Sequence, residues 1–423
     1  MPKKTAWKKK FDAASIVARV SECRRSGANP RIEFEGGEGV AFTTRVHATV
    51  ATLYSALEWP TGLEPEERHL AIGRGIGAIA AEKSITPENL LSSIQREAAK
   101  IHARAWQPFV VQTSVSLPHD ARIRSRILAC GACRFHRIQK WDLTAINHYL
   151  SDALPGGYDS PHFKWVTVHA YGRTENMALR RATHSFDVLR GIWNLSILHG
   201  TWKLYLGAHP KPLSRLTMGP LATLHDSSTH VPTGAFQYNQ AALIGANQVW
   251  EGNQSNLFKF ERRVANILKA SNVLDFVQDG LVSYVRALDH AQPLDAFHGL
   301  WRVFEYLTGG LNGAYDTNVE RALACYPARA NHSYIRQELL HLQSLRNQLV
   351  HEGNQPPELS ESTQQLLNHI HILLHNWIFV FGSFRSPEEV WAFLDLPYEE
   401  SALRRLRSLA DRSLALRYPR TIG

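Results

Sequence analysis

The chain has 423 residues, 44% of them hydrophobic, and carries a formal net charge of +9. This length predicts at least two domains, because a single hydrophobic core rarely grows beyond about 300 residues. A transmembrane helix needs roughly 18 apolar residues in a row and a secretion signal needs an apolar stretch after its basic start; the sequence has neither, so we expect a cytoplasmic protein.

Residues 1–250 predict a mixed α/β domain. Apolar residues at helical spacing indicate helices at 11–26, 87–106 and 174–195. Alternating or β-branched runs indicate strands at 31–35, 110–117 and 164–170, and Gly- and Pro-containing loops lie between these segments. No catalytic constellation is evident in this part of the chain.

Four cysteines in a chain of this length favour reduced thiols over a disulfide framework. Cys130 and Cys133, followed by His136, have the spacing of half a zinc site, but the sequence has no second Cys-x-x-Cys pair. Residues 73–77 are rich in glycine, yet they follow no predicted strand and contain no lysine to hold phosphates. We therefore expect no metal and no bound cofactor, and metal binding by the two cysteines stays an open alternative.

Residues 251–423 predict an all-α domain. Amphipathic helices are expected at 300–310, which ends in two glycines, at 333–349, and at 364–381, where His369, His371 and His375 interrupt an apolar face. The domain ends in a basic helix, and a second basic cluster lies at the start of the chain. Both are typical of solvated surfaces, although direct contact with RNA is an alternative.

The candidate site lies on the last turns of the helix at 333–349. Arg346 is followed by the polar Asn347 and, four residues later, by His351. At about 100° per residue, Asn347 and His351 share one face, whereas Arg346 lies roughly 140° away from His351. A phosphate is therefore gripped more easily if a second copy of this helix faces the first, which favours a homodimer. Such a pair is also common on solvated helix surfaces and as a C-terminal helix cap.

Through the segments at 300–310 and 345–353, residues 289–381 resemble the HEPN superfamily of small helical domains, and most closely its ApeA-like branch from anti-phage defence. HEPN domains carry an arginine, a polar residue and, three to five residues later, a histidine; Arg346, Asn347 and His351 match this order and spacing. The resemblance implies a dimeric, metal-independent endoribonuclease with these residues at the dimer cleft. It also implies a supporting acidic residue on the preceding helix, for which Glu305 is the candidate.

The implied chemistry needs a base and a cation. Neutral His351 would accept the proton of a ribose 2′-OH, and the alkoxide would attack the adjacent phosphorus to leave a 2′,3′-cyclic phosphate. Arg346 would neutralise the phosphate, and Asn347 would orient a phosphate oxygen or the imidazole. For Glu305, a structural ion pair with Arg302 or Arg336 is an equal alternative.

The resemblance and the two-part layout also suggest regulation and partners. A nuclease that cuts cellular RNA must be restrained, so residues 1–250 are interpreted as a sensing or regulatory domain with a phage-derived trigger. The expected partners are RNA, with tRNA anticodon loops as an attractive target, and further copies of the chain in a homodimer or higher homo-oligomer, with no membrane. The competing hypothesis is a non-catalytic helical dimerisation module that binds nucleotide or a partner protein.

Overall fold

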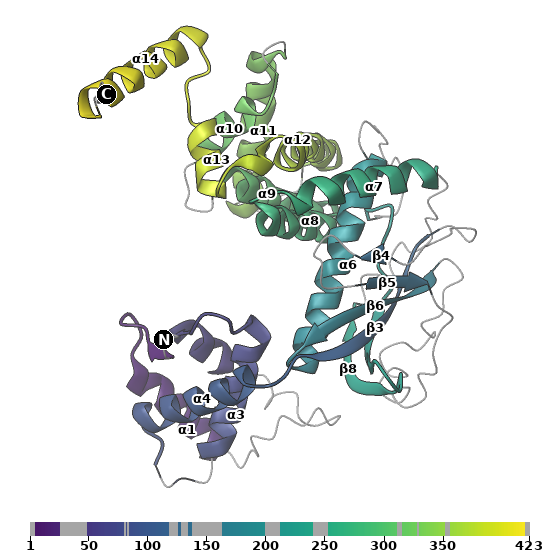
Figure 1. The fold of residues 1–423 in the computed structure, drawn as a ribbon, viewed down its shortest axis with the longest axis vertical. Coiled ribbons are helices and arrows are strands. Elements are labelled where there is room, and N and C mark those ends of the chain that lie inside the picture. Colours follow the sequence, from purple (N-terminus) through teal and green to yellow (C-terminus); the bar gives the residue numbers. More distant parts are fainter. Residues whose placement is uncertain are drawn as a thin grey trace, which may run out of the picture. The chain divides into compact units, whose positions relative to one another are not determined.

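The computed structural model (Figure 1) describes most of the chain, in segments. These are residues 5–25, 49–79, 82, 84–117, 126–127, 134–137, 163–198, 212–239, 253–310, 315–327, 330–351 and 356–418. The chain divides into two compact units. The first comprises Met1–Val111, His169–Ala182 and Thr223–Ala235, and the second comprises Gln112–Val168, Thr183–Ala222 and Phe236–Gly423.

The first unit contains a helical cluster. Its elements are β1 (Ala6–Trp7), α1 (Ala13–Arg25), β2 (Leu57–Glu58), α3 (Pro65–Ile79) and α4 (Pro87–His102), and β1 pairs with β2 in antiparallel fashion. Helix α4 starts with a capping box, in which Thr86 Oγ1 accepts from the Asn89 backbone and Asn89 Oδ1 accepts from the Thr86 backbone. The predicted helices at 11–26 and 87–106 are confirmed, with slightly shorter bounds.

A six-stranded sheet forms among the described residues, in the order β4-β5-β6-β3-β7-β8. Its strands are β3 (Gln107–Val115), β4 (Arg126–Ile127), β5 (Arg134–Arg137), β6 (Lys164–Gly172), β7 (Leu221–Asp226) and β8 (Pro232–Tyr238). The predicted strands at 110–117 and 164–170 are thereby confirmed as β3 and β6. The strand predicted at 31–35 and the pair Cys130 and Cys133 lie outside the described residues.

The other described elements from residue 175 onward, apart from β7 and β8, are helices, and α6 (Glu175–Leu198) begins in the first unit. After α6 come α7 (Gln254–Lys269), α8 (Leu274–Leu288), α9 (Pro293–Thr308), α10 (Tyr315–Ala324), α11 (His332–His351), α12 (Leu359–Phe379), the short 3-10 helix η3 (Phe381–Ser383), α13 (Pro387–Leu394) and α14 (Glu400–Arg417). The helices predicted at 174–195, 300–310, 333–349 and 364–381 correspond to α6, α9, α11 and α12. The fold is therefore mixed α+β with an all-helical C-terminal part.

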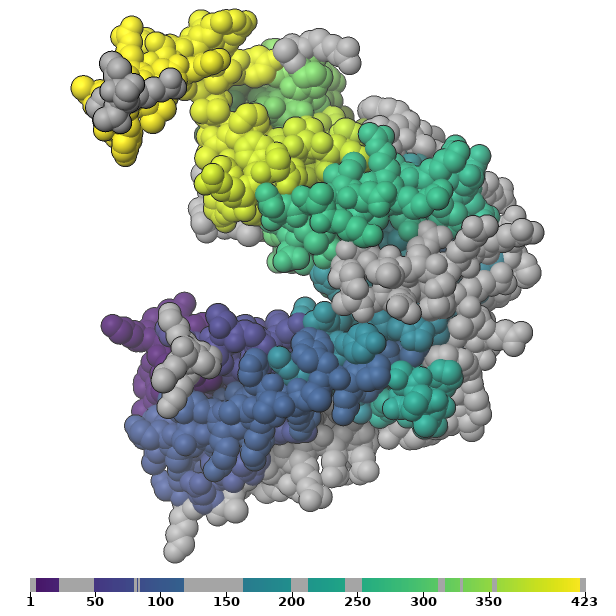
Figure 2. Space-filling view, in the orientation of Figure 1, coloured from purple at the N-terminus to yellow at the C-terminus, as the bar shows by residue number. Residues whose placement is uncertain are grey.

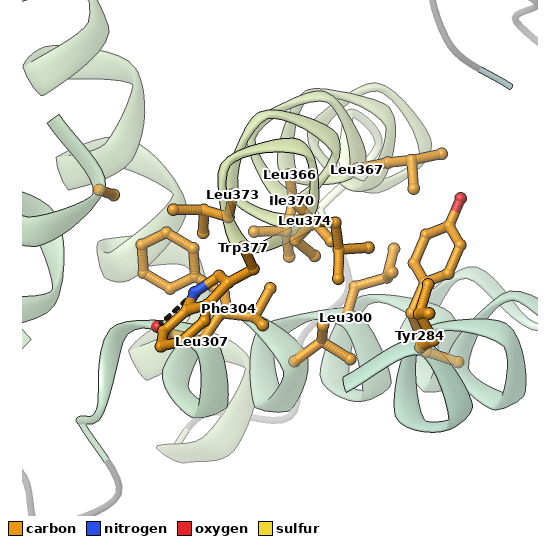
Figure 3. Packing of buried hydrophobic residues seen from close by; sticks show 14 of the residues in the cluster. Tyr284, Leu300, Phe304, Leu307, Leu366, Leu367, Ile370, Leu373, Leu374 and Trp377 are labelled. Carbon is orange, nitrogen blue, oxygen red and sulfur yellow. Dashed lines mark hydrogen bonds between the residues drawn. The ribbon is translucent and has the colours of Figure 1, made fainter. Parts of the chain in front are cut away.

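The helices α8, α9 and α12 form the centre of the bundle core (Figure 3). Phe304 and Leu307 of α9 face Leu373 and Trp377 of α12, and the indole of Trp377 donates to the Leu307 carbonyl at 3.1 Å. The same core includes Val188, Ile192, Leu195 and Leu198 of α6, which lie before residue 250. The domain boundary at that residue stays a prediction.

A glycine permits the close crossing of α8 and α9. A Cβ atom built on Gly299 would lie 2.8 Å from the Ala287 Cβ, closer than real side chains approach. The absence of a side chain at this position therefore lets the two helices pack with their backbones close together. His298 directly precedes this glycine on α9. Separately, none of the described helices is long and apolar enough to cross a lipid bilayer.

Candidate functional site

Helix α9 presents one polar stripe on an otherwise buried surface. Its buried residues are Ala296, Phe297, Leu300, Trp301, Val303, Phe304, Leu307 and Thr308. Asp295, His298, Arg302 and Glu305 recur at steps of three and four residues, so they lie on one face of the helix. Because the remaining circumference is buried in the core, this stripe is the part of α9 that is available for chemistry.

Helix α11 places the predicted motif beside its own buried face. Leu339, Leu342, Leu345 and Leu349 anchor the helix in the bundle core. Arg346 and Asn347 are half-buried, and Arg346 Nη1 donates to Asn347 Oδ1 at 3.2 Å. The amide therefore holds part of the guanidinium, which limits the motion of its long stem. His351 is exposed and is the last residue of the helix, one turn beyond Asn347.

The structure brings Arg346 of α11 into electrostatic contact with His298 of α9. Partial burial lowers the pKa of His298, and the positive charges of Arg346 and Arg302 lower it further, while Asp295 opposes them. The imidazole of His298 is therefore held in its neutral form to a lower pH than an ordinary histidine. A neutral imidazole can accept a proton, and the nearby arginines can attract an anion.

Glu305 has a local partner. Its Oε1 accepts a hydrogen bond from the Trp301 indole at 2.8 Å, within α9 itself. Arg336, one of the two arginines considered as a structural partner for Glu305, instead pairs with Glu320 of α10, with 2.7 Å between Nη2 and Oε2. Glu305 thus shares the polar stripe with His298 and Arg302, and its role at the site stays a prediction.

The histidines of α12 have different surroundings. His371 is buried and hydrogen-bonded to the Tyr284 hydroxyl at 2.8 Å, and buried His369 is paired with the Tyr326 hydroxyl at 2.5 Å. Burial lowers the pKa of His369 to about 4. Each buried imidazole is therefore hydrogen-bonded to a tyrosine, buried Tyr284 or half-buried Tyr326, which is a structural task. His375 is exposed and packs against the ring of Phe379.

His298 is the site residue that the sequence pattern alone did not reveal. Its signal is the stripe of Asp295, His298, Arg302 and Glu305 on an apolar helix, but this stripe resembles any solvated helix face. His298 differs from an ordinary surface histidine because Arg346, which lies on a different helix, lowers its pKa. Within the part of the chain that the structure describes, no group of three His, Cys, Asp or Glu residues could hold a metal ion.

No family model, curated protein or solved structure matches this chain. The chemistry of the side chains on α9 and α11 is therefore the basis for a functional assignment.

Proposed function

We propose that the chain is a HEPN-like, metal-independent endoribonuclease whose site is formed by α9 and α11. The observation that carries this proposal is the half-buried Arg346, held by Asn347 on α11, whose charge lowers the pKa of His298 on α9. Cations gathered around a neutral imidazole match the needs of phosphodiester cleavage, which requires a phosphate clamp and a proton acceptor. The formal net charge of +9 supports a polyanionic substrate.

The proposed reaction uses groups that the chain itself supplies. An imidazole, of His351 or His298, accepts the proton of the ribose 2′-OH, and the resulting alkoxide forms a bond to the adjacent phosphorus. The bond from phosphorus to the 5′-oxygen breaks, and that oxygen takes up a proton from an imidazolium. The products are a 2′,3′-cyclic phosphate and a 5′-hydroxyl end. Arg346 stabilises the charge that builds on the phosphate, and Asn347 and Glu305 position the reacting groups.

The biological role follows from the same proposal. A chain that cleaves RNA, with tRNA as the favoured substrate, would act as an anti-phage effector by halting translation in the infected cell. The N-terminal domain would then sense the phage-derived trigger and release the activity. In this scheme the active form is a homodimer, since two copies of α11 facing each other would place a second Arg346 and His351 at one phosphate.

The experiment is an RNA cleavage assay in EDTA with the purified full chain and total cellular RNA. We expect cleavage to end in cyclic phosphates and to fall by about 10²–10³-fold in Arg346→Ala and His351→Ala. Arg336→Ala and His341→Ala are matched controls on the same helix, because Arg336 pairs with Glu320 and His341 is exposed. Equal loss in controls and site variants, or no cleavage by a wild-type chain supplied with infected-cell extract, would support a non-catalytic binding module.

Mixing two inactive variants tests whether the site is shared between copies. In a heterodimer of Arg346→Ala and His351→Ala, one of the two shared sites regains both wild-type residues. If each site draws its arginine and its histidine from different copies, we expect the equimolar mixture to recover about a quarter of the wild-type rate. A mixture as inactive as its components would place both groups in one copy.

A further inference from the structure

Helix α14 (Figure 2, yellow) contributes no residue to the bundle core. None of its residues is buried, although it is rich in leucine. Leu409, Leu414 and Leu416 are 52%, 58% and 83% exposed, and Leu403 and Leu406 are also exposed. Tyr418, which follows the helix, is 74% exposed. An exposed apolar surface of this kind on a regular helix indicates a binding face.

The residues of α14 segregate around its axis. At about 100° per residue, Leu403, Leu406, Leu409, Leu414 and Leu416 fall within an arc of roughly 160°, which near the end of the helix also contains Ser413 and Arg417. Arg407 lies at one border of this arc, and Arg405 and Arg412 lie at the other. Arg404 lies on the polar face, where it pairs with Glu400 at 2.5 Å. The helix therefore combines a leucine-rich face, interrupted near its end by Ser413 and Arg417, with arginines along both of its edges.

We propose that α14 binds the surface of an anionic lipid bilayer, with its leucines in the boundary between headgroups and acyl chains. Arginines at both borders of the apolar arc reach the phosphates and carboxylates of anionic headgroups while the leucines leave water. This surface is separate from α9 and α11. The inference therefore does not depend on the proposed nuclease function.

Two other occupants fit the helix less well. A single-stranded RNA would neutralise the arginines but leave the leucine face in water. A coiled coil with a second copy needs apolar residues at alternating steps of three and four. The register Ala402, Leu406, Leu409, Ser413 and Leu416 follows these steps, but Ser413 interrupts it, and Leu403 and Leu414 lie outside its seam. A lipid surface requires only an apolar face and a basic border, and α14 has both.

Co-sedimentation of the full chain with lipid vesicles tests the proposal. We expect binding to phosphatidylcholine vesicles that contain roughly 30% phosphatidylserine, weakening as salt is added, and little binding to pure phosphatidylcholine. The triple variant Arg405→Gln, Arg407→Gln, Arg412→Gln should bind about fivefold more weakly for each arginine removed. Lys259→Gln, Arg262→Gln, Lys269→Gln removes the same charge from exposed positions of α7 and should bind like the wild type, after correction for its net charge.

The apolar face needs its own variants. Leu406→Gln with Leu414→Gln should abolish binding to anionic vesicles, whereas Val231→Gln, at an equally exposed apolar position, should leave it unchanged. Because none of these positions is buried, circular dichroism and the denaturation midpoint should match the wild type. Vesicle binding that survives the leucine variants overturns the proposal. So does an arginine-dependent affinity for RNA without affinity for vesicles, or self-association that the leucine variants abolish.

Discussion

Two arginines of the second unit show how differently the same side chain is used. Arg190 of α6 is buried and lies between two carboxylates, with its Nη2 2.6 Å from Asp187 Oδ1 and 2.9 Å from Asp289 Oδ2. Arg346 of α11 is half-buried, donates to the neutral amide of Asn347, and adds its charge to that of Arg302 at the His298 imidazole. The first cation lies between two carboxylates, and the second acts on the pKa of a histidine on another helix.

The surroundings of the two arginines indicate which one stabilises the fold and which one is a candidate for function. Burial lowers the pKa of Arg190, but the charges of Asp289 and Asp187 outweigh this effect and raise it overall, so the charged form is retained inside the protein. Arg346 and Arg302 both lower the pKa of His298, and Asp295 opposes them. A histidine whose pKa is shifted by charges on its own helix and on α11 is a candidate for function.

The largest expected effect is at Arg190. Arg190→Met leaves Asp187 buried without its main cation, so we expect the free energy of unfolding to fall by about 3–5 kcal/mol. Arg286→Met is the matched control, because Arg286 binds the same Asp187 but is 54% exposed, and its loss should cost no more than about 1 kcal/mol. Urea denaturation measures both. An equal loss of stability in the two variants would mean that the buried Arg190 contributes no more than the exposed Arg286.

His369 extends the structural side of the comparison to pH. Its pKa is lowered to about 4 in the folded state, whereas an unfolded histidine titrates near 6.5. The unfolded chain therefore binds more protons between these values, so stability is fully present above about pH 6.5 and declines as pH falls toward 4, by up to about 3 kcal/mol from this residue. Denaturation midpoints across this window should fall less steeply in His369→Gln. An equally steep fall of the denaturation midpoint in the wild type and the variant would contradict the lowered pKa of His369.

Gly299 connects packing to the site. Gly299→Ala forces the added methyl against Ala287 of α8, and we expect a loss of about 1–3 kcal/mol in the free energy of unfolding. Gly77→Ala on α3 is the control, since nothing lies within 4 Å of its added Cβ, and it should be neutral or stabilise by about 0.4–1 kcal/mol. Thermal denaturation distinguishes the two. A harmless Gly299→Ala would mean that α8 and α9 do not approach so closely.

The smallest and most specific effect is at His298. Arg346→Gln removes a positive charge that disfavours the imidazolium, so we expect the pKa of His298 to rise toward that of an ordinary histidine. NMR titration of the imidazole signals measures this change, and Arg336→Gln on the same helix should leave the His298 curve in place. If both variants leave it unchanged, the two helices do not share one electrostatic site.

Helical periodicity predicted much of the bundle. The step of three and four residues through Leu339, Leu342, Leu345 and Leu349 gave a helix at 333–349, and α11 spans His332–His351. The pattern at 364–381 ran past the helix end, because α12 stops at Phe379 and the apolar Phe381 belongs to the separate 3-10 helix. Apolar residues on both sides of such a break look continuous in sequence. The helix α3, which contains the glycine-rich residues 73–77, was not predicted, since glycine is unfavourable in helix interiors.

The sequence by itself determined the position of several strands and helices along the chain and the absence of a long apolar helix. It also placed Arg346, Asn347 and His351 at the end of one helix. These are properties of contiguous segments, and a local pattern suffices to specify them. Only the tertiary structure decided that His298 lies within the field of Arg346, that Glu305 is bound by Trp301, and that His369 and His371 are buried against tyrosines. Charge, burial and hydrogen bonding depend on which helices pack together, and that choice is made by the whole core.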